Sequence, residues 1–224
     1  MICFAGAVSS RAKEPADTST SQLGDVPLQQ VAPGIFQLGS VRLNKERKTI
    51  QFPATINMTN GLIEYLVVTG IGKLHESILK TDTEPSQIHI AMLFIGAQGA
   101  GTNSIRTNIS GDKFTIELNW KNGGSEKHAY AEDFIFNSKT KSPMSKVAWI
   151  YNGSKLIDGT FIAQRDGSIV AIISDPLALA NNAQPDRDND EIWFVKTNAV
   201  PPLNTAVEVT FQLEWPPKNA KNEK

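Results

Sequence analysis

The stretch TAVEVTFQLEW (residues 205–215) decides the fold of this chain. Apolar side chains occupy every second position from Val207 to Trp215, and polar side chains fill the positions between them. Successive side chains of a strand point to opposite faces, so the alternation predicts a β-strand with one buried and one solvated face. The proline pair at residues 216–217 cannot continue the strand, which ends the fold near Trp215.

Turn sequences between alternating segments extend the same pattern toward the N-terminus. Their glycine and asparagine residues tolerate the positive φ that tight hairpin turns require. Three hairpins are predicted, over residues 49–69 about Asn60-Gly61, 113–136 about Asn122-Gly123-Gly124, and 161–173 about Asp166-Gly167. The sequence therefore predicts a mainly β fold, with antiparallel sheets built from hairpins and stacked as in a sandwich.

Helical signals are few. Residues 83–96 combine an N-cap threonine and an early proline with apolar residues at three- and four-residue steps, and Gly96 ends the pattern. Residues 174–181 have a cap, a first-turn proline and alanines, which is enough for about two turns. We expect one longer and one short helix packed on the sheets, at the border of the α+β class.

The chain divides into three parts. Residues 1–33 begin with an apolar segment, residues 1–8, that is too short to span a membrane and is typical of the end of a secretory signal. A flexible linker follows, then a single β-rich domain over residues 34–215 and a polar tail over residues 216–224. The sequence thus predicts export to the periplasm or cell envelope. Cys3 is either a lipid anchor or an incidental cysteine.

Composition excludes several classes of function. The chain has 22 basic and 23 acidic side chains and a net charge of -1, so it lacks the basic patch typical of nucleic-acid binding. A single cysteine excludes a disulfide framework, a cysteine-rich zinc site and an iron–sulfur cluster. No apolar run is long enough for a transmembrane helix. Any metal would have to use His, Asp, Glu or backbone oxygen.

Two of the three histidines, together with a glutamate, form the first candidate site. His75, Glu76 and His89 could ligate a divalent metal, because two imidazoles and a carboxylate with an open position suit Zn²⁺. Adjacent residues on a strand point to opposite faces, so His75 and Glu76 should diverge unless the segment bends. The alternative is structural, with Glu76 capping the next helix and His75 bonding to backbone.

Three alternating carboxylates form a second, weaker candidate. Asp186, Asp188 and Asp190 have the spacing of the first ligands of a calcium loop. The expected glycine and final glutamate are replaced by Glu191 and Thr197. A solvated acidic loop is therefore the alternative.

The order of these signals resembles the YdjY-type domain, found in exported bacterial proteins and without an established activity. The resemblance covers roughly residues 33–215 and departs after the first helix, where Gln98–Gly101 replaces the usual Pro-Gly. It implies export and supplies no catalytic residues. It is carried by Gly72–Ser77 (GKLHES), His89 with Ala91–Gly96, Trp120, Trp149 with Gly153-Ser154, Asp166-Gly167 and Asp175-Pro176.

These observations lead to three hypotheses. The first is a non-enzymatic envelope domain that binds an unidentified ligand or envelope protein without a cofactor. The second is a metal-dependent enzyme centred on His75, Glu76 and His89. The third is a structural envelope component that assembles through a sheet edge.

Overall fold

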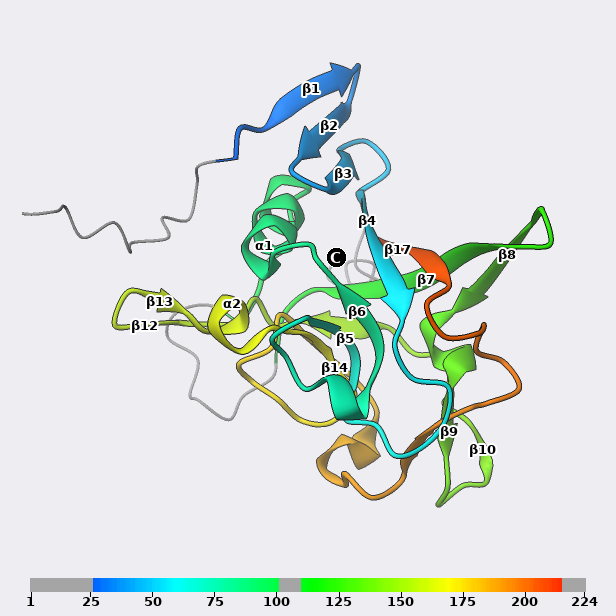
Figure 1. Cartoon of the computed structure of the whole chain (residues 1–224). Helices are drawn as coiled ribbons and strands as arrows, with labels where there is room; N and C mark the ends of the chain where they lie inside the picture. The colour runs from blue at the N-terminus through cyan, green and yellow to red at the C-terminus, as the bar shows by residue number, and fades with distance from the viewer. Residues whose placement is uncertain (1–25, 101–109, 215–224) are drawn as a thin grey trace, which may run out of the picture.

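The computed structural model describes residues 26–100 and 110–214 (Figure 1). Most of the predicted signal remnant and linker, residues 1–25, lies outside the described residues. The predicted tail at residues 216–224 also lies outside them, as do Cys3 and Trp215. No helix in the described part of the chain has the length and apolar character needed to cross a membrane.

Eight strands of the described residues close into one mixed β-barrel. Around the barrel the order is β4, β17, β7, β11, β15, β14, β5 and β6, and β6 then pairs with β4. The β5–β6 and β14–β15 pairs are parallel, and the other neighbours are antiparallel. The strands are β4 (Thr49–Ile56), β5 (Tyr65–Thr69), β6 (Ser77–Thr81), β7 (Lys113–Asn122), β11 (Trp149–Tyr151), β14 (Ser168–Ala171), β15 (Ala180–Asn181) and β17 (Ala206–Leu213).

The prediction of a mainly β fold is confirmed, but the prediction of a sandwich is wrong. The difference arises at one strand, because β4 shares one of its edges between two partners. Residues 49–51 of β4 pair with β3, and residues 55 and 56 pair with β6. The sheet therefore branches at β4, and the β6 branch closes the barrel.

The other branch forms an arm above the barrel in Figure 1. It contains β1 (Gln29–Ala32), β2 (Ile35–Leu38) and β3 (Val41–Asn44), paired in that order. At the right of Figure 1, β8 (Ser125–Tyr130) pairs with β7 and extends the sheet away from the barrel. The smaller sheets comprise β9 (Ile135–Asn137), β10 (Ser142–Pro143) and β16 (Trp193–Val195), and β12 (Leu156–Ile157) with β13 (Thr160–Phe161).

The alternation of the last strand is confirmed. Val207, Val209, Phe211 and Leu213 of β17 are buried, whereas the residues between them are exposed or half-buried. The Phe211 ring lies 5.2 Å from that of Phe52 on β4 and 4.7 Å from that of Phe114 on β7. The inward faces of these three neighbouring strands therefore form one part of the core.

The longer predicted helix is confirmed as α1 (Pro85–Phe94). It buries Ile88, Ala91 and Met92 in the same core as the barrel strands and packs against β3 and β4. Gly96 ends the helix at φ +96°, and Lys48 Nζ donates a 2.7 Å hydrogen bond to the Ile95 carbonyl. Three short 3-10 helices complete the described elements: η1 (Leu74–Glu76), η2 (Ala131–Phe134) and η3 (Pro185–Asp188).

Of the three predicted hairpins, the structure contains the central one. β7 and β8 are joined by Gly123 and Gly124, whose φ values of +56° and +82° fit a two-residue turn. The hairpin about Asn60-Gly61 is wrong, because β6 lies between β4 and β5 in the barrel. Gly61 does adopt φ +100°, but the chain then turns toward β16, where Leu62 bridges Phe194.

The hairpin about Asp166-Gly167 is also wrong. Residues 162–166 form the short helix α2 (Ile162–Asp166), and Gly167 ends it in the left-handed conformation at φ +69°. An Asp-Gly pair suits a helix C-terminus as well as a hairpin turn, since both need positive φ. The short helix predicted over residues 174–181 is absent there, and that segment instead connects β14 to β15. The described residues thus contain two short α-helices.

Candidate functional site

The segment Gly72–Ser77 makes a tight connection between two parallel strands. β5 ends at Thr69 and β6 begins at Ser77, which lies beside Tyr65 in the parallel register. Residues 70–76 therefore return the chain along the whole length of β5. Parallel strands usually need connections of about a dozen residues or more, so this return is unusually short.

Gly72 allows the connection to lie close to its neighbours. A Cβ atom on Gly72 would lie 2.8 Å from the Val68 Cβ and 3.0 Å from the Gly167 carbonyl oxygen. One of these atoms is a Cβ and the other a backbone oxygen, so neither can move away by rotation of a side chain. Gly70, in the same connection, has open space at the equivalent position. The motif therefore requires glycine at residue 72 for a steric reason.

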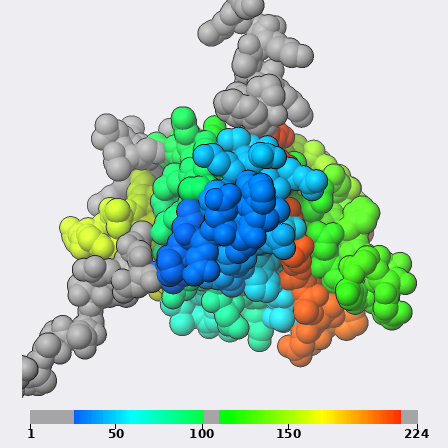
Figure 2. Space-filling view, turned by 90° about the horizontal axis from the view of Figure 1, so that it is seen from above, coloured from blue at the N-terminus to red at the C-terminus, as the bar shows by residue number. Residues whose placement is uncertain are grey.

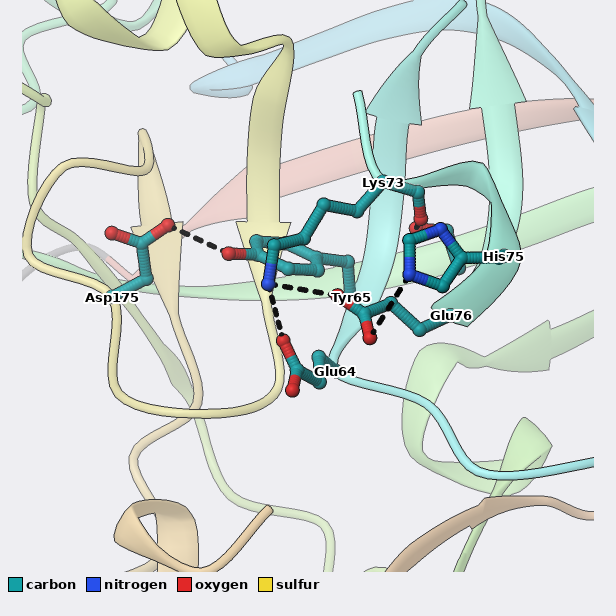
Figure 3. A network of polar contacts seen from close by, with 7 residues as sticks. Glu64, Tyr65, Lys73, His75, Glu76 and Asp175 are labelled. Carbon is teal, nitrogen blue, oxygen red and sulfur yellow. Dashed lines mark hydrogen bonds and ion pairs between the residues drawn. The ribbon is translucent and has the colours of Figure 1, made fainter. Parts of the chain in front are cut away.

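Lys73 lies between two glutamates and above an aromatic ring (Figure 3). Its Nζ is 2.7 Å from Glu64 Oε2, 2.8 Å from Glu76 Oε1 and 5.3 Å from the centre of the Tyr65 ring. Partial burial alone would lower the pKa of Lys73, but its hydrogen bonds to Glu64 and Glu76 outweigh that effect and raise the pKa. The ammonium group is thus held in its charged form between the two carboxylates.

Tyr65 links this network to the second parallel connection, which runs from β14 to β15. Its hydroxyl donates a 3.0 Å hydrogen bond to Asp175 Oδ2, and burial together with the nearby Asp175 raises the pKa of Tyr65. Asp175 Oδ1 accepts from the Leu177 amide, and Asn181 exchanges two 2.8 Å hydrogen bonds with the Asp175 backbone. The polar network of Figure 3 therefore ties the two connections together.

The sequence-predicted residues His75 and Glu76 have different environments. The His75 side chain is 80% exposed, and its Nε2 lies 3.6 Å from Glu76 Oε2. The Glu76 side chain is only 17% exposed and is held by Lys73. Because the segment is a 3-10 turn rather than a strand, the two side chains stay near each other instead of diverging.

His89 belongs to a separate cluster beneath α1. Its Nδ1 lies 2.7 Å from the Tyr151 hydroxyl, and its ring centre lies 5.0 Å from that of Phe161. Burial lowers the pKa of His89 and raises the pKa of Tyr151. The pair is therefore neutral at pH 7 and joins α1 to the barrel strand β11.

Neither sequence-predicted metal site forms in the described residues. Across residues 26–100 and 110–214, no three His, Cys, Asp or Glu side chains gather closely enough to hold a metal ion. His75, Glu76 and His89 do not come together as predicted: Glu76 is held by Lys73, and His89 lies in the separate cluster with Tyr151. Asp186, Asp188 and Asp190 do not form a calcium site either, and Asp186 pairs with Lys139 at 2.9 Å.

A groove on the outer face of the sheet was not anticipated from the sequence. Two open hollows of about 420 and 670 Å³ lie over the outward side chains of β3, β4, β17 and β7. The two hollows share Arg42, Gln51 and Asn119 and so form one feature, the sheet groove. In Figure 2 the orange and red atoms near β17 lie between the light-blue atoms of β3 and β4 and the green atoms of β7 and β8. Volumes in this range are typical of ligand sites.

The family model of the YdjY domain matches residues 41–212 of the chain. The chain belongs to the YdjY family. The matched region contains the barrel, both parallel connections with their polar network, and most of the sheet groove. The resemblance of the chain to the YdjY family is thus confirmed over residues 41–212. Neither a curated protein nor a solved structure matches the chain.

A buried acid is another feature of this YdjY domain that sequence reasoning missed. Glu132 on η2 is 3% exposed, and its Oε1 accepts a 3.0 Å hydrogen bond from Trp149 Nε1. Burial raises the pKa of Glu132 to about 7, despite the opposing hydrogen bond from Trp149. Its position beside Asp133, just after an exposed strand, gave no sign in the sequence that the side chain points inward.

The lowered pKa of His89 predicts a loss of stability in acid. As the pH falls below 6.5, the unfolded YdjY domain takes up a proton at His89 before the folded domain does. The free energy of unfolding should therefore fall relative to that of a His89→Asn variant as the pH decreases from 7 toward 5. Urea unfolding across this range measures the difference, with His128→Asn on the exposed β8 strand as the matched control. A constant difference between wild type and His89→Asn would contradict the prediction.

Proposed function

We propose that this YdjY domain is an exported, non-enzymatic binding module of the cell envelope, and that its ligand or partner lies in the sheet groove. The observation that carries the proposal is the groove itself, where polar side chains of four strands line two joined hollows. A rigid sheet is a good scaffold for such a site, because backbone hydrogen bonds on both sides fix each strand.

The polar groups elsewhere support a binding role over a catalytic one. Lys73 is held by Glu64 and Glu76, and the Tyr65 hydroxyl is bonded to Asp175. These contacts join the two parallel connections, so the polar residues in them have a structural role. The apolar start and polar linker of the chain support export, as does the family resemblance.

A threonine-to-arginine pair of variants tests the location of the binding surface. Thr210 points outward from the middle of β17 into the groove, and Thr160 is exposed on β13, outside it. Thr210→Arg should weaken binding of the purified domain to the isolated envelope fraction by about tenfold or more, because the larger charged side chain occupies the groove. Thr160→Arg should bind as wild type does.

Cosedimentation of the domain with envelope material, over a range of protein concentrations, gives both affinities. Equal binding by wild type and Thr210→Arg would overturn the assignment of the groove. Fractionation of source cells that express the tagged full-length chain tests export, and recovery of the mature protein in the cytoplasm would contradict it.

A further inference from the structure

The side chains that line the sheet groove form rows that run across the strands. Arg42 on β3 lies opposite Gln51 on β4, Gln51 opposite Thr210 on β17, and Thr210 opposite Glu117 on β7. Residues in opposed positions lie on the same face of a sheet, so these four side chains form one row. At about 4.8 Å per strand the row is about 14 Å long. The groove therefore suits an extended ligand laid across the strands.

The charges along the groove are balanced. Among the described lining residues, three basic side chains are matched by three acidic ones. These are Arg42, Arg47 and Lys121, with Glu117, Glu126 and Glu208. Lys121 and Glu126 also pair with each other at 3.4 Å. An anionic polymer or a cationic peptide gains no net attraction from such a surface, whereas a neutral ligand meets no repulsion.

Between the charges lie amide and hydroxyl side chains, which both donate and accept hydrogen bonds. Gln51 Nε2 contacts Glu208 Oε1 at 3.0 Å and Thr210 Oγ1 at 3.4 Å, which fixes the orientation of this amide. Asn119 lines both hollows from the neighbouring strand. Sugar hydroxyls also act as both donors and acceptors, so they can form hydrogen bonds with these amide and hydroxyl side chains.

Trp120, next to Asn119 on β7, is half-buried on the inner face of the sheet, opposite the buried Val207. Its ring packs edge-on against Phe134 with 5.7 Å between centroids. The outward face of the sheet therefore offers a ligand polar side chains rather than an aromatic stacking surface. The two other tryptophans within the described residues, Trp149 and Trp193, are buried in the core.

We propose that the sheet groove binds a neutral, unbranched glycan segment, which lies across β3, β4, β17 and β7 with its hydroxyls on Gln51 and Asn119. This inference rests on the proposed binding function and names the ligand class for the same groove. Position separates this ligand class from an extended peptide. A peptide that adds a strand to a sheet binds the backbone of a free strand edge, whereas the groove offers side chains on a sheet face.

Titration calorimetry of the full chain with defined oligosaccharides tests the inference. The probes are the hexasaccharides of β-1,4-linked glucose and of β-1,4-linked N-acetylglucosamine, compared with an anionic hexagalacturonate and a neutral Gly-Ser peptide. At least one neutral hexasaccharide should bind saturably at millimolar concentration or below. Failure of both to bind, or tighter binding of the galacturonate or the peptide, would overturn the proposal.

Removal of one groove amide should weaken the binding. Gln51→Ala and Asn119→Ala are each expected to raise the dissociation constant by about tenfold, the loss expected for one or two hydrogen bonds. Asn119→Asp keeps the side-chain shape while replacing the donor, and should weaken binding as well. Gln30→Ala removes an exposed amide from β1, outside the groove, and should leave the affinity unchanged. Affinities unchanged in the groove variants would place the glycan elsewhere and overturn the assignment.

The two proposals fail in different ways. If Thr210→Arg abolishes binding to the envelope fraction but neither hexasaccharide binds, the groove is a binding site for another ligand and only the glycan inference is wrong. If a hexasaccharide binds through Gln51 and Asn119 but the envelope fraction does not bind at all, the glycan inference stands and the envelope role is wrong. Circular dichroism and the unfolding midpoint of each variant show whether the fold is intact.

Discussion

Gly72→Ala is expected to lower the free energy of unfolding by about 3 kcal/mol, which is the upper range for overpacking at a site that cannot relax. The added methyl group would meet the Val68 Cβ at 2.8 Å and the Gly167 carbonyl at 3.0 Å. Relief requires the β5–β6 connection to move away from the turn that follows α2. That movement would also disturb Lys73 and its contacts with Glu64 and Glu76.

Gly70→Ala provides a matched control two residues away. A Cβ atom on Gly70 meets nothing within 4 Å, and its backbone does not require positive φ. This substitution should leave stability within about 0.5 kcal/mol of wild type, or raise it slightly by restricting the unfolded chain. Urea unfolding with a common m-value compares the two variants. Similar stabilities of Gly72→Ala and Gly70→Ala would show that the close approach at Gly72 is not rigid.

Glu132→Gln should stabilise the protein at alkaline pH and have little effect in acid. Burial raises the pKa of Glu132 to about 7 in the folded protein, from an ordinary value of 4.5 for a glutamate. As the pH rises from 4.5 to 7, the unfolded state loses its proton first, so the folded state becomes less stable over this window. A pKa raised by this much corresponds to about 3 kcal/mol of lost stability at pH 8.

The neutral amide of Glu132→Gln avoids this cost while its oxygen can still accept the hydrogen bond from Trp149. Because the new amide nitrogen is also buried, the net gain at pH 8 is expected to be about 2 kcal/mol. Urea unfolding of wild type and variant at pH 4 and pH 8 measures the gain, with Glu126→Gln on the exposed β8 strand as control. A stability difference that does not change with pH would contradict the buried, charged state of Glu132 at pH 8.

The parts of the fold that were predictable from sequence are those specified by local signals. The alternation in β17, the glycine pair between β7 and β8, and the proline and glycine that bound α1 each act within about a dozen residues. Closure of the barrel depends instead on two parallel pairs, β5–β6 and β14–β15, whose short connections resemble ordinary turns in sequence. A sandwich was predicted because every turn was assumed to join antiparallel neighbours.

The candidate sites show the same division. His75 and Glu76 are adjacent in sequence, but Glu76 is engaged by Lys73 and His89 by Tyr151, and neither contact is visible as a motif. The sheet groove was missed because its residues occupy the outward positions of strands, which are normally solvated. The outward positions of β4 and β17 include neutral polar residues, Gln51, Thr210 and Gln212, beside the charged Glu208. This mixture does not differ enough from an ordinary solvated face to indicate a groove.

The place of β17 in the barrel has a consequence for the order of folding. This strand lies between β4 and β7 and is paired with both along most of its length, yet it is the last strand of the described chain. During synthesis from the N-terminus, β4 and β7 are therefore made before the strand that pairs with both of them. The barrel wall stays open until residues 206–213 emerge. Completion of the barrel is thereby coupled to the emergence of β17, its last strand in the described sequence order.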